Sequence, residues 1–198
     1  MTLDTKSLIL DLYAIHAFQF NSFTLKSGIQ SPIYIDLRLI ISYPHLLKKM
    51  SAALHTLVSP LSFNHLCGVP YAAIPIATAL ALAGDYPMVF CRKEAKDYGM
   101  KKLVEGKFEK GQTCLLVEDV ITSGASILET VHSLRSEGLI VNDVVVMLDR
   151  EQGGKENLKK QGIALHALLN IFTVLQVLLE EKKITQEAVD NVTTFLKT

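Results

Sequence analysis

This sequence has no excess of charge of either sign: lysine plus arginine and aspartate plus glutamate each number 20, so the formal net charge is zero. A neutral chain has no global field that attracts a nucleic acid or an anionic membrane. A long hydrophobic run is also missing. Although 49% of the residues are hydrophobic, the longest apolar stretch, 72–84, contains Pro75 and Thr78 and is shorter than the roughly 20 residues of a membrane-spanning helix. We therefore expect neither a nucleic acid nor a membrane as a partner, and any anion must be bound by a local group of residues.

Cysteine is scarce and tryptophan is absent. Cys67, Cys91 and Cys114 are odd in number, lie far apart and form no Cys-x-x-Cys pair, so we expect buried reduced thiols in place of disulfides or metal ligands. The six histidines show no metal-ligand spacing, which argues against a zinc site held by the protein. Charged residues interrupt the N-terminal apolar pattern, which therefore lacks the core of a secretory signal, and a cytoplasmic location is expected.

The chain of 198 residues is long enough for one α/β domain, 1–198, with a well-buried core. Helical spacing predicts an opening helix over 3–18, and two β-type runs, 23–26 and 33–38, predict a hairpin, so residues 1–40 form a small N-terminal subregion. From residue 44 the pattern alternates between helices and continuously apolar strands, which is typical of a doubly wound, mainly parallel sheet covered on both faces. The predicted helices are 44–58, 74–83, 125–137, 154–161, 171–181 and 185–196, and the predicted strands are 65–69, 87–91, 113–118, 141–148 and 163–168.

The strongest motif is LVEDVITSGAS at 116–126. A buried strand delivers Glu118 and Asp119, and a turn of small residues then opens a helix, where the free N–H groups and hydroxyls of 122–126 suit a phosphate. Ligands bind at the carboxyl ends of strands in open α/β sheets, and two carboxylates there suit ribose hydroxyls and a magnesium ion. Taken alone, the Thr-Ser-Gly turn is better explained as an ordinary helix cap.

This segment resembles the phosphoribosyl pyrophosphate signature of type I phosphoribosyltransferases. The resemblance implies that Glu118 and Asp119 address the ribose hydroxyls, with Asp119 also catalytic, and that residues 122–126 hold the 5-phosphate. It further implies Mg²⁺ bound together with phosphoribosyl pyrophosphate, with no metal held by the protein alone. The whole implied site for that substrate in this segment is Glu118, Asp119, Val120, Ile121, Thr122, Ser123, Gly124, Ala125 and Ser126.

Three further segments are similar to the orotate phosphoribosyltransferase family. The runs FTLKSG at 23–28 and SPIYID at 31–36 resemble that family's hood over the base. The segment 148–154 follows the next core strand and places Arg150 at the same sheet edge, where its guanidinium matches the carboxylate of orotate. The resemblance assigns orotate to Lys26, Tyr34, Ile35, Thr122 and Arg150, with Lys26 also at phosphoribosyl pyrophosphate. Considered singly, an exposed lysine, a core tyrosine and a surface salt bridge are the alternatives.

The polar stretch 92–112 begins with RKEAKDYG, which resembles the mobile catalytic loop of the same family. A charge run of this kind is usually a solvated surface. Departure of pyrophosphate develops negative charge, however, and a cationic lid supplies donors to it when the site closes. The resemblance places Arg92, Lys93, Lys96 and Tyr98 at phosphoribosyl pyrophosphate, with Lys96 catalytic.

The run CGVPYAAIP at 67–75 resembles the pyrophosphate loop, which puts Tyr71 and Ala72 at the diphosphate. Ala72 stands where many single-function bacterial members carry lysine, and Tyr98 replaces a frequent histidine. Together with a longer basic lid, these departures look more like the orotate phosphoribosyltransferase half of bifunctional uridine monophosphate synthase. Whether Lys101 or Lys102 compensates for Ala72 stays open.

The implied activity is transfer of the 5-phosphoribosyl group from phosphoribosyl pyrophosphate to orotate, in a homodimer with shared active sites. Two alternatives remain at this point. A phosphoribosyltransferase for another base, such as a purine, shares the carboxylate signature but does not need Lys26 or Arg150. A non-enzymatic sensor of phosphoribosyl pyrophosphate that binds a nucleic acid is disfavoured by the neutral net charge.

Overall fold

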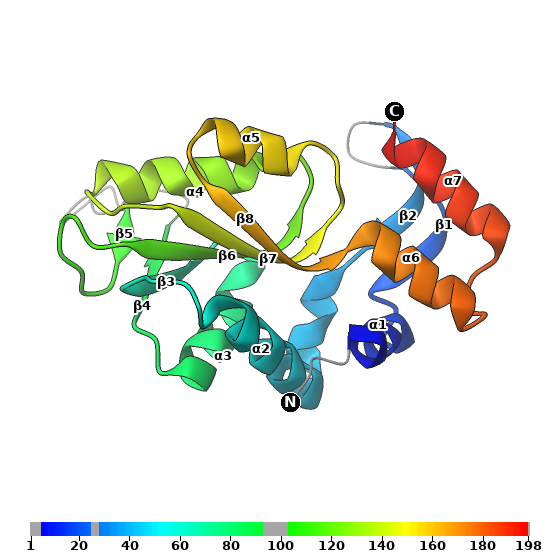
Figure 1. The fold of residues 1–198 in the computed structure, drawn as a ribbon, viewed down its shortest axis with the longest axis horizontal. Helices are drawn as coiled ribbons and strands as arrows, with labels where there is room; N and C mark the ends of the chain where they lie inside the picture. Colours follow the sequence, from blue (N-terminus) through cyan, green and yellow to red (C-terminus); the bar gives the residue numbers. More distant parts are fainter. Residues whose placement is uncertain (1–4, 25–27, 93–102, 198) are drawn as a thin grey trace.

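A six-stranded sheet occupies the centre of the structure, a computed structural model that describes residues 5–24, 28–92 and 103–197 (Figure 1). In spatial order its strands are β5 (Val104–Glu105), β4 (Met88–Cys91), β3 (His65–Gly68), β6 (Cys114–Ile121), β7 (Asp143–Asp149) and β8 (Ala164–Asn170). Every neighbouring pair is parallel except β4 with β5, which is antiparallel. The predicted doubly wound, mainly parallel sheet is confirmed.

Helices cover both faces of this sheet (Figure 1). On one face lie α2 (Pro44–Val58) and α3 (Ala73–Gly84), and on the other lie α4 (Ala125–Ser136) and α5 (Gly154–Lys160). Successive strand residues alternate between two buried clusters: Leu115 and Val117 pack with α2 and α3, whereas Cys114 and Leu116 pack with α4. Burial of alternate residues on opposite faces explains why the strands are continuously apolar.

The N-terminal elements are α1 (Thr5–Ala14), the antiparallel hairpin of β1 (Phe18–Thr24) and β2 (Gln30–Ile35), and the 3₁₀ helix η1 (Leu37–Ser42). The predicted hairpin is confirmed, but its strands begin at Phe18 and Gln30 and not at residues 23 and 33 as predicted. Two predicted ends are also wrong. The helix predicted to reach residue 18 ends at Ala14, because His16 adopts a left-handed φ of 60° and Phe18 begins β1. The strand predicted to reach residue 38 ends at Ile35, because Asp36 caps η1.

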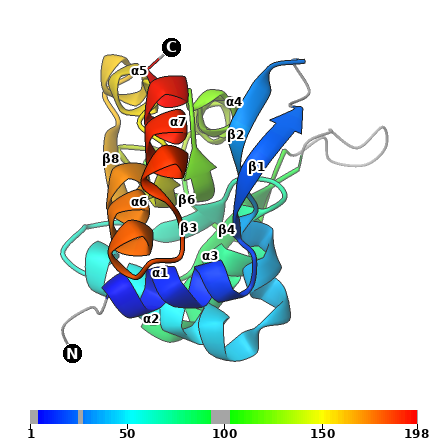
Figure 2. The same cartoon turned by 90° about the vertical axis from the view of Figure 1, so that its right-hand side faces the viewer.

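The last two helices, α6 (Ile171–Glu180) and α7 (Gln186–Leu196), pack beside the hairpin (Figure 2). Ile33 of β2 is 1% exposed and joins a third apolar cluster, whose other buried members are Ile171, Leu175, Val192 and Leu196. Residues from opposite ends of the chain therefore share one small core, and this core fixes the hairpin relative to the sheet.

All three cysteines are free and buried, as expected, on the adjacent strands β3, β4 and β6. Contact with the Cys114 thiol and burial raise the pKa of Cys67, and contact with Cys67 and burial raise the pKa of Cys91. Both groups are therefore protonated, unreactive thiols. Within the part of the chain that the structure describes, no three histidine, cysteine or acidic side chains converge as a metal site, and no helix has the length and apolarity to cross a membrane.

Candidate active site

The carboxyl ends of the central parallel strands form the edge at which the site lies. β3 pairs with β6 only as far as Gly68 opposite Val117, whereas β6 continues beside β7 until Ile121 lies opposite Asp149. The last four residues of β6 thus extend past the end of β3. The predicted strand end at residue 118 is wrong by three residues, because pairing with β7 continues through the two carboxylates and their neighbours.

Glu118 is a buried carboxyl at this edge, only 5% exposed. Its Oε1 accepts a hydrogen bond from the Asp119 N–H (3.0 Å), and its Oε2 accepts one from the Ser126 hydroxyl (3.1 Å). Burial, and secondarily the negative charge of Asp119, raise the pKa of Glu118 to about 8. Near neutral pH the ligand-free site therefore carries one of its two adjacent carboxyls mainly in the protonated form.

The turn after β6 leads directly into α4. Thr122 and Ser123 are exposed, and Gly124 precedes the helix with a φ of 83°, a left-handed conformation that side chains rarely adopt. No side-chain cap bonds the first N–H groups of α4, which leaves them available to an anion at the positive end of the helix dipole. The Ser126 hydroxyl, in contrast, is committed to Glu118.

Helix α5 supports the turn from behind. The side-chain amide of Asn157 donates to the Ser123 carbonyl at 3.0 Å. Gly154, the first residue of α5, lies so close that an added Cβ would come within 2.4 Å of the Thr122 carbonyl oxygen. Sequence reasoning did not identify either residue as part of the site, although a glycine at the start of a helix beside a predicted loop is a signal of close approach.

Arg150 follows β7 and is held beside the same turn, because its backbone N–H donates to the Ile121 carbonyl at 3.1 Å. Its side chain is largely buried, and its Nε has no hydrogen-bond partner among the described residues. Burial lowers the pKa of Arg150 from its ordinary value. A buried guanidinium nitrogen without a partner is costly, and an anionic ligand would remove that cost.

The loop after β3 and the start of the polar stretch meet at a second part of the edge. A small cavity of about 130 Å³ is lined by Pro70, Arg92 and Ser126 among others, so the loop, the end of β4 and the start of α4 converge there. Arg92 also approaches Glu105 of β5, with Nη1 3.5 Å from Oε1. Tyr71 is 64% exposed and Ala72 is half-buried. Of the predicted diphosphate contacts, Arg92 lines this cavity, whereas Tyr71 and Ala72 follow Pro70 in the loop and are not among its lining residues.

The hairpin brings Tyr34 to the site region. Its ring packs against Phe23, with centroids 5.5 Å apart, and its hydroxyl accepts a hydrogen bond from Arg38 Nη2 at 3.2 Å. Ile35 is half-buried and packs against the main core. Six positions singled out in the sequence lie outside the described residues and have no structural account: Lys26, Lys93, Lys96, Tyr98, Lys101 and Lys102.

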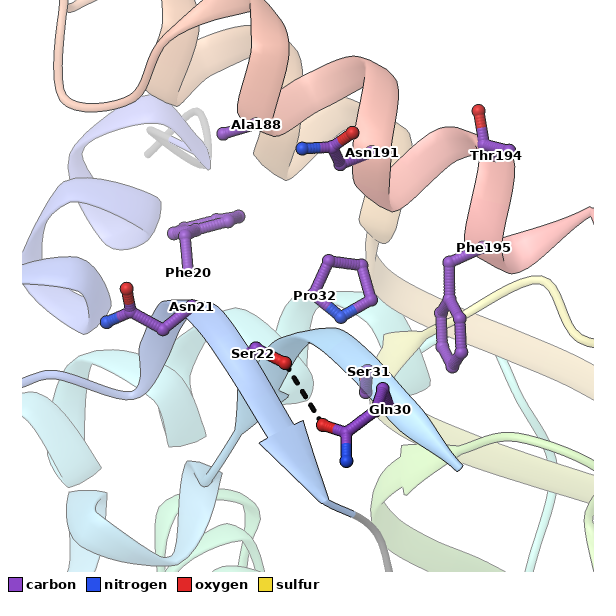
Figure 3. Close-up of a pocket in the computed structure, with 10 residues that line it drawn as sticks. All are labelled: Phe20, Asn21, Ser22, Gln30, Ser31, Pro32, Ala188, Asn191, Thr194 and Phe195. Carbon is purple, nitrogen blue, oxygen red and sulfur yellow. Dashed lines mark hydrogen bonds between the residues drawn. The ribbon is translucent and has the colours of Figure 1, made fainter. Parts of the chain in front are cut away.

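A larger cavity, of about 610 Å³, lies elsewhere, between the hairpin and α7 (Figure 3). Its described lining residues carry no charged side chain. Phe20, Pro32 and Phe195 contribute apolar surface, and Ser22 donates to Gln30 at 3.0 Å along its floor. None of the predicted site residues that the structure describes lines it. Size alone therefore does not locate the chemistry, which gathers at the carboxyl edge of the sheet.

The model of the phosphoribosyl transferase domain matches residues 45–174, which include the parallel strands, the two adjacent carboxyls and the turn after them, so the chain is a phosphoribosyltransferase. The chain is 43% identical to the orotate phosphoribosyltransferase of Caenorhabditis elegans over 179 residues, which cover 89% of this chain and 79% of that protein. It belongs to the orotate phosphoribosyltransferase family.

The relatives also include longer proteins. The chain is 47% identical to uridine 5'-monophosphate synthase of Bos taurus over 193 residues, 96% of this chain and 40% of that protein. The solved structure of Leishmania donovani UMP synthase matches it with a TM-score of 0.90 at 33% identity, over 98% of this chain and 42% of that one. The chain thus spans about two fifths of the length of the UMP synthases it matches.

Proposed function

We propose that this chain transfers the 5-phosphoribosyl group of phosphoribosyl pyrophosphate to orotate, giving orotidine 5-monophosphate and pyrophosphate in the synthesis of UMP. The observation that carries the proposal is the buried Arg150 Nε, which has no hydrogen-bond partner among the described residues. The backbone N–H of Arg150 is bonded to the carbonyl of Ile121, the last residue of β6. A guanidinium in this position favours a base that carries a carboxylate, as orotate does. Neutral purine bases have no such group.

Each part of the edge has one task in this proposal. Glu118 and Asp119 bind the ribose hydroxyls, the turn 122–126 holds the 5-phosphate, and the loop 69–72 with Arg92 meets the diphosphate. The ring nitrogen of orotate loses its proton to solvent and forms a bond to the anomeric carbon, while the bond from that carbon to the pyrophosphate oxygen breaks. No covalent enzyme intermediate is needed, so the residues act by positioning and by stabilising the departing charge. Lys26, Lys93, Lys96 and Tyr98 keep their predicted roles as donors.

The oxygen ligands at the edge fit Mg²⁺, which prefers carboxylate, phosphate and water oxygens. Asp119 is only half-buried, and its Oδ1 accepts from the Val120 N–H at 2.8 Å. One carboxylate of this kind is too little to hold the ion alone, so oxygens of the substrate would have to supply further ligands. The bound ion supplies charge neutralisation to the diphosphate.

An assay of purified protein with orotate, phosphoribosyl pyrophosphate and magnesium tests the proposal. We expect loss of orotate absorbance that a chelator abolishes and excess magnesium restores. Adenine, hypoxanthine and guanine in place of orotate should release no pyrophosphate. Turnover of a purine in preference to orotate would contradict the assigned base, and full turnover in excess chelator would contradict the metal requirement.

We also propose a single domain over residues 1–198, with residues 1–40 as its hood, and a homodimer in which two subunits share each active site. The apolar core common to β2, α6 and α7 supports the first part, because it joins the hairpin to the last two helices. The cytoplasmic location expected from the sequence stays a prediction.

A further inference from the structure

Tyr34, Asp36 and Arg38 form a hydrogen-bonded network at the end of the hairpin. Arg38 Nε donates to Asp36 Oδ1 at 2.6 Å, and Arg38 Nη2 donates to Asp36 Oδ2 at 2.8 Å. The same Nη2 donates to the Tyr34 hydroxyl at 3.2 Å. The fork of two bonds to one carboxylate fixes the guanidinium plane, and the third bond ties that plane to the tip of the tyrosine.

The Tyr34 ring is therefore restrained on two sides. Its hydroxyl is held by Arg38, and its ring contacts Phe23 on the paired strand, tilted by 38°. Asp36 is itself fixed, because its Oδ1 accepts from the Arg38 backbone N–H at 3.2 Å as the cap of η1. Hydrogen bonds therefore join the ring, the guanidinium and the cap into one unit.

This unit is joined to the central sheet through η1. Side chains alternate along a strand, and Ile33 points into the apolar core with α6 and α7, so its neighbour Tyr34 points to the opposite side of the hairpin. The following η1 packs against β6, the strand that carries Glu118 and Asp119. The restrained ring thus stands on the side of the hairpin where the proposed orotate site lies.

We infer that Arg38, held by Asp36, is a positioning residue that fixes the Tyr34 ring as one wall of the orotate site. The inference rests on the proposed function. Because Arg38 already has a carboxylate partner in Asp36, it does not compete with Arg150 for the carboxylate of orotate. Its contribution is to keep the ring in the orientation that the base meets, which reduces the conformational freedom lost on binding.

Because Arg38 is exposed to solvent, an experiment can distinguish its role in positioning Tyr34 from a role in folding stability. The Arg38 side chain is 57% exposed, whereas that of Asp36 is 17% exposed, and an ion pair with one partner in solvent contributes little to folding stability. Removal of the network should therefore alter orotate binding and leave thermal stability nearly unchanged. A residue that mattered only for folding would show the reverse.

The test compares Tyr34→Phe, Arg38→Met and the double variant in steady-state assays. Each single variant should raise the KM for orotate about three- to fivefold, with kcat and the KM for phosphoribosyl pyrophosphate within twofold of the unmutated values. The double variant should lose no more than either single one, because both remove the same bond. Arg38→Lys, which cannot form the fork, should recover part of the loss at most.

Tyr13→Phe is the matched control, because the Tyr13 hydroxyl donates to the Lys183 carbonyl at 3.0 Å, away from the proposed site. It should leave the KM for orotate unchanged. Additive losses in the double variant, equal rises in both KM values, or the same rise in the control would each overturn the inference. Unmutated protein that fails to use orotate would overturn the proposed function and this inference together, whereas normal turnover with unchanged KM in the Arg38 variants would overturn only the inference.

Discussion

Glu118 is a carboxyl whose burial has a measurable consequence for stability. Its folded pKa of about 8 lies above the ordinary value of 4.5, so between these two pH values the folded state binds more protons than the unfolded state. Stability should be unaffected by this group below pH 4.5, fall as pH rises toward 8, and level off above that.

Glu118→Gln removes the titration and keeps the size and the acceptor for Ser126. We expect the melting temperature of the variant to fall less between pH 5 and pH 8.5 than that of the unmutated protein, since each kcal/mol shifts it by about 2–4 °C in a chain of this size. Parallel pH profiles of the two proteins would show that Glu118 is ionised in both states.

Arg150 separates recognition of the base from recognition of the sugar phosphate. Arg150→Ala should raise the KM for orotate at least about thirtyfold, equivalent to about 2 kcal/mol, because the orotate carboxylate loses its partner. The KM for phosphoribosyl pyrophosphate should change less than threefold. Arg135→Ala serves as the control, since Arg135 donates to the Val141 carbonyl at 2.9 Å and should affect stability alone. Equal losses for both substrates would move Arg150 out of the base pocket.

Individual residues show how far sequence reasoning reaches. Glu118 and Asp119 can be predicted as site residues from the sequence, because a strand, two carboxylates and a small-residue turn follow one another in one run. Their different environments are not readable, because Glu118 is buried by residues distant in the chain and only Asp119 remains half-exposed. The role of Arg38 depends on the orientation of the guanidinium, which no spacing of residues specifies.

At the scale of elements, the helices and core strands follow from apolar periodicity, and the errors lie at their ends. β5 has only two residues and no period to detect. β6 runs to Ile121 because β7 continues to pair with it, a contact between segments that the local pattern does not contain. The end of α1 was obscured because Phe18 fits the helical spacing and also begins a strand.

Packing of α5 against the turn after β6 gives a prediction at this scale. Gly154→Ala would place a Cβ 2.4 Å from the Thr122 carbonyl oxygen and 2.6 Å from the Ile121 side chain, so the turn must shift. We expect the KM for phosphoribosyl pyrophosphate to rise about tenfold, a cost of about 1.4 kcal/mol. Titration of the variant with phosphoribosyl pyrophosphate measures this directly.

Gly162→Ala is the control for the same helix. Gly162 has a φ of 71° and no atom within 4 Å of an added Cβ, so alanine there should cost about 1–2 kcal/mol of stability through backbone strain and leave substrate binding unchanged. A rise in KM of the same size in both variants would mean that general destabilisation, and not displacement of the turn, causes the effect.

The proposed sharing of active sites between two subunits is a property of the whole molecule. If Lys96 acts in the site that contains Asp119 of the partner subunit, Lys96→Ala and Asp119→Asn should each be nearly inactive alone. Subunits mixed in equal amounts give about half mixed dimers, each with one intact site, so activity should return to about one quarter of the unmutated level. Subunit exchange verified by mass spectrometry without recovered activity would mean that Lys96 serves its own subunit.

The rate of alkylation of the three thiols on β3, β4 and β6 can report on opening of the sheet. They are at most 2% exposed and lie on adjacent strands, and Cys91 also lines the small cavity beside Arg92. A water-soluble alkylating reagent therefore reaches Cys67 and Cys114 only when these strands separate. The rate at which they are labelled under native conditions then measures the free energy of that opening, as amide exchange does for a core strand. Ligands that bind the carboxyl edge of the folded sheet should slow the labelling in proportion to their affinity.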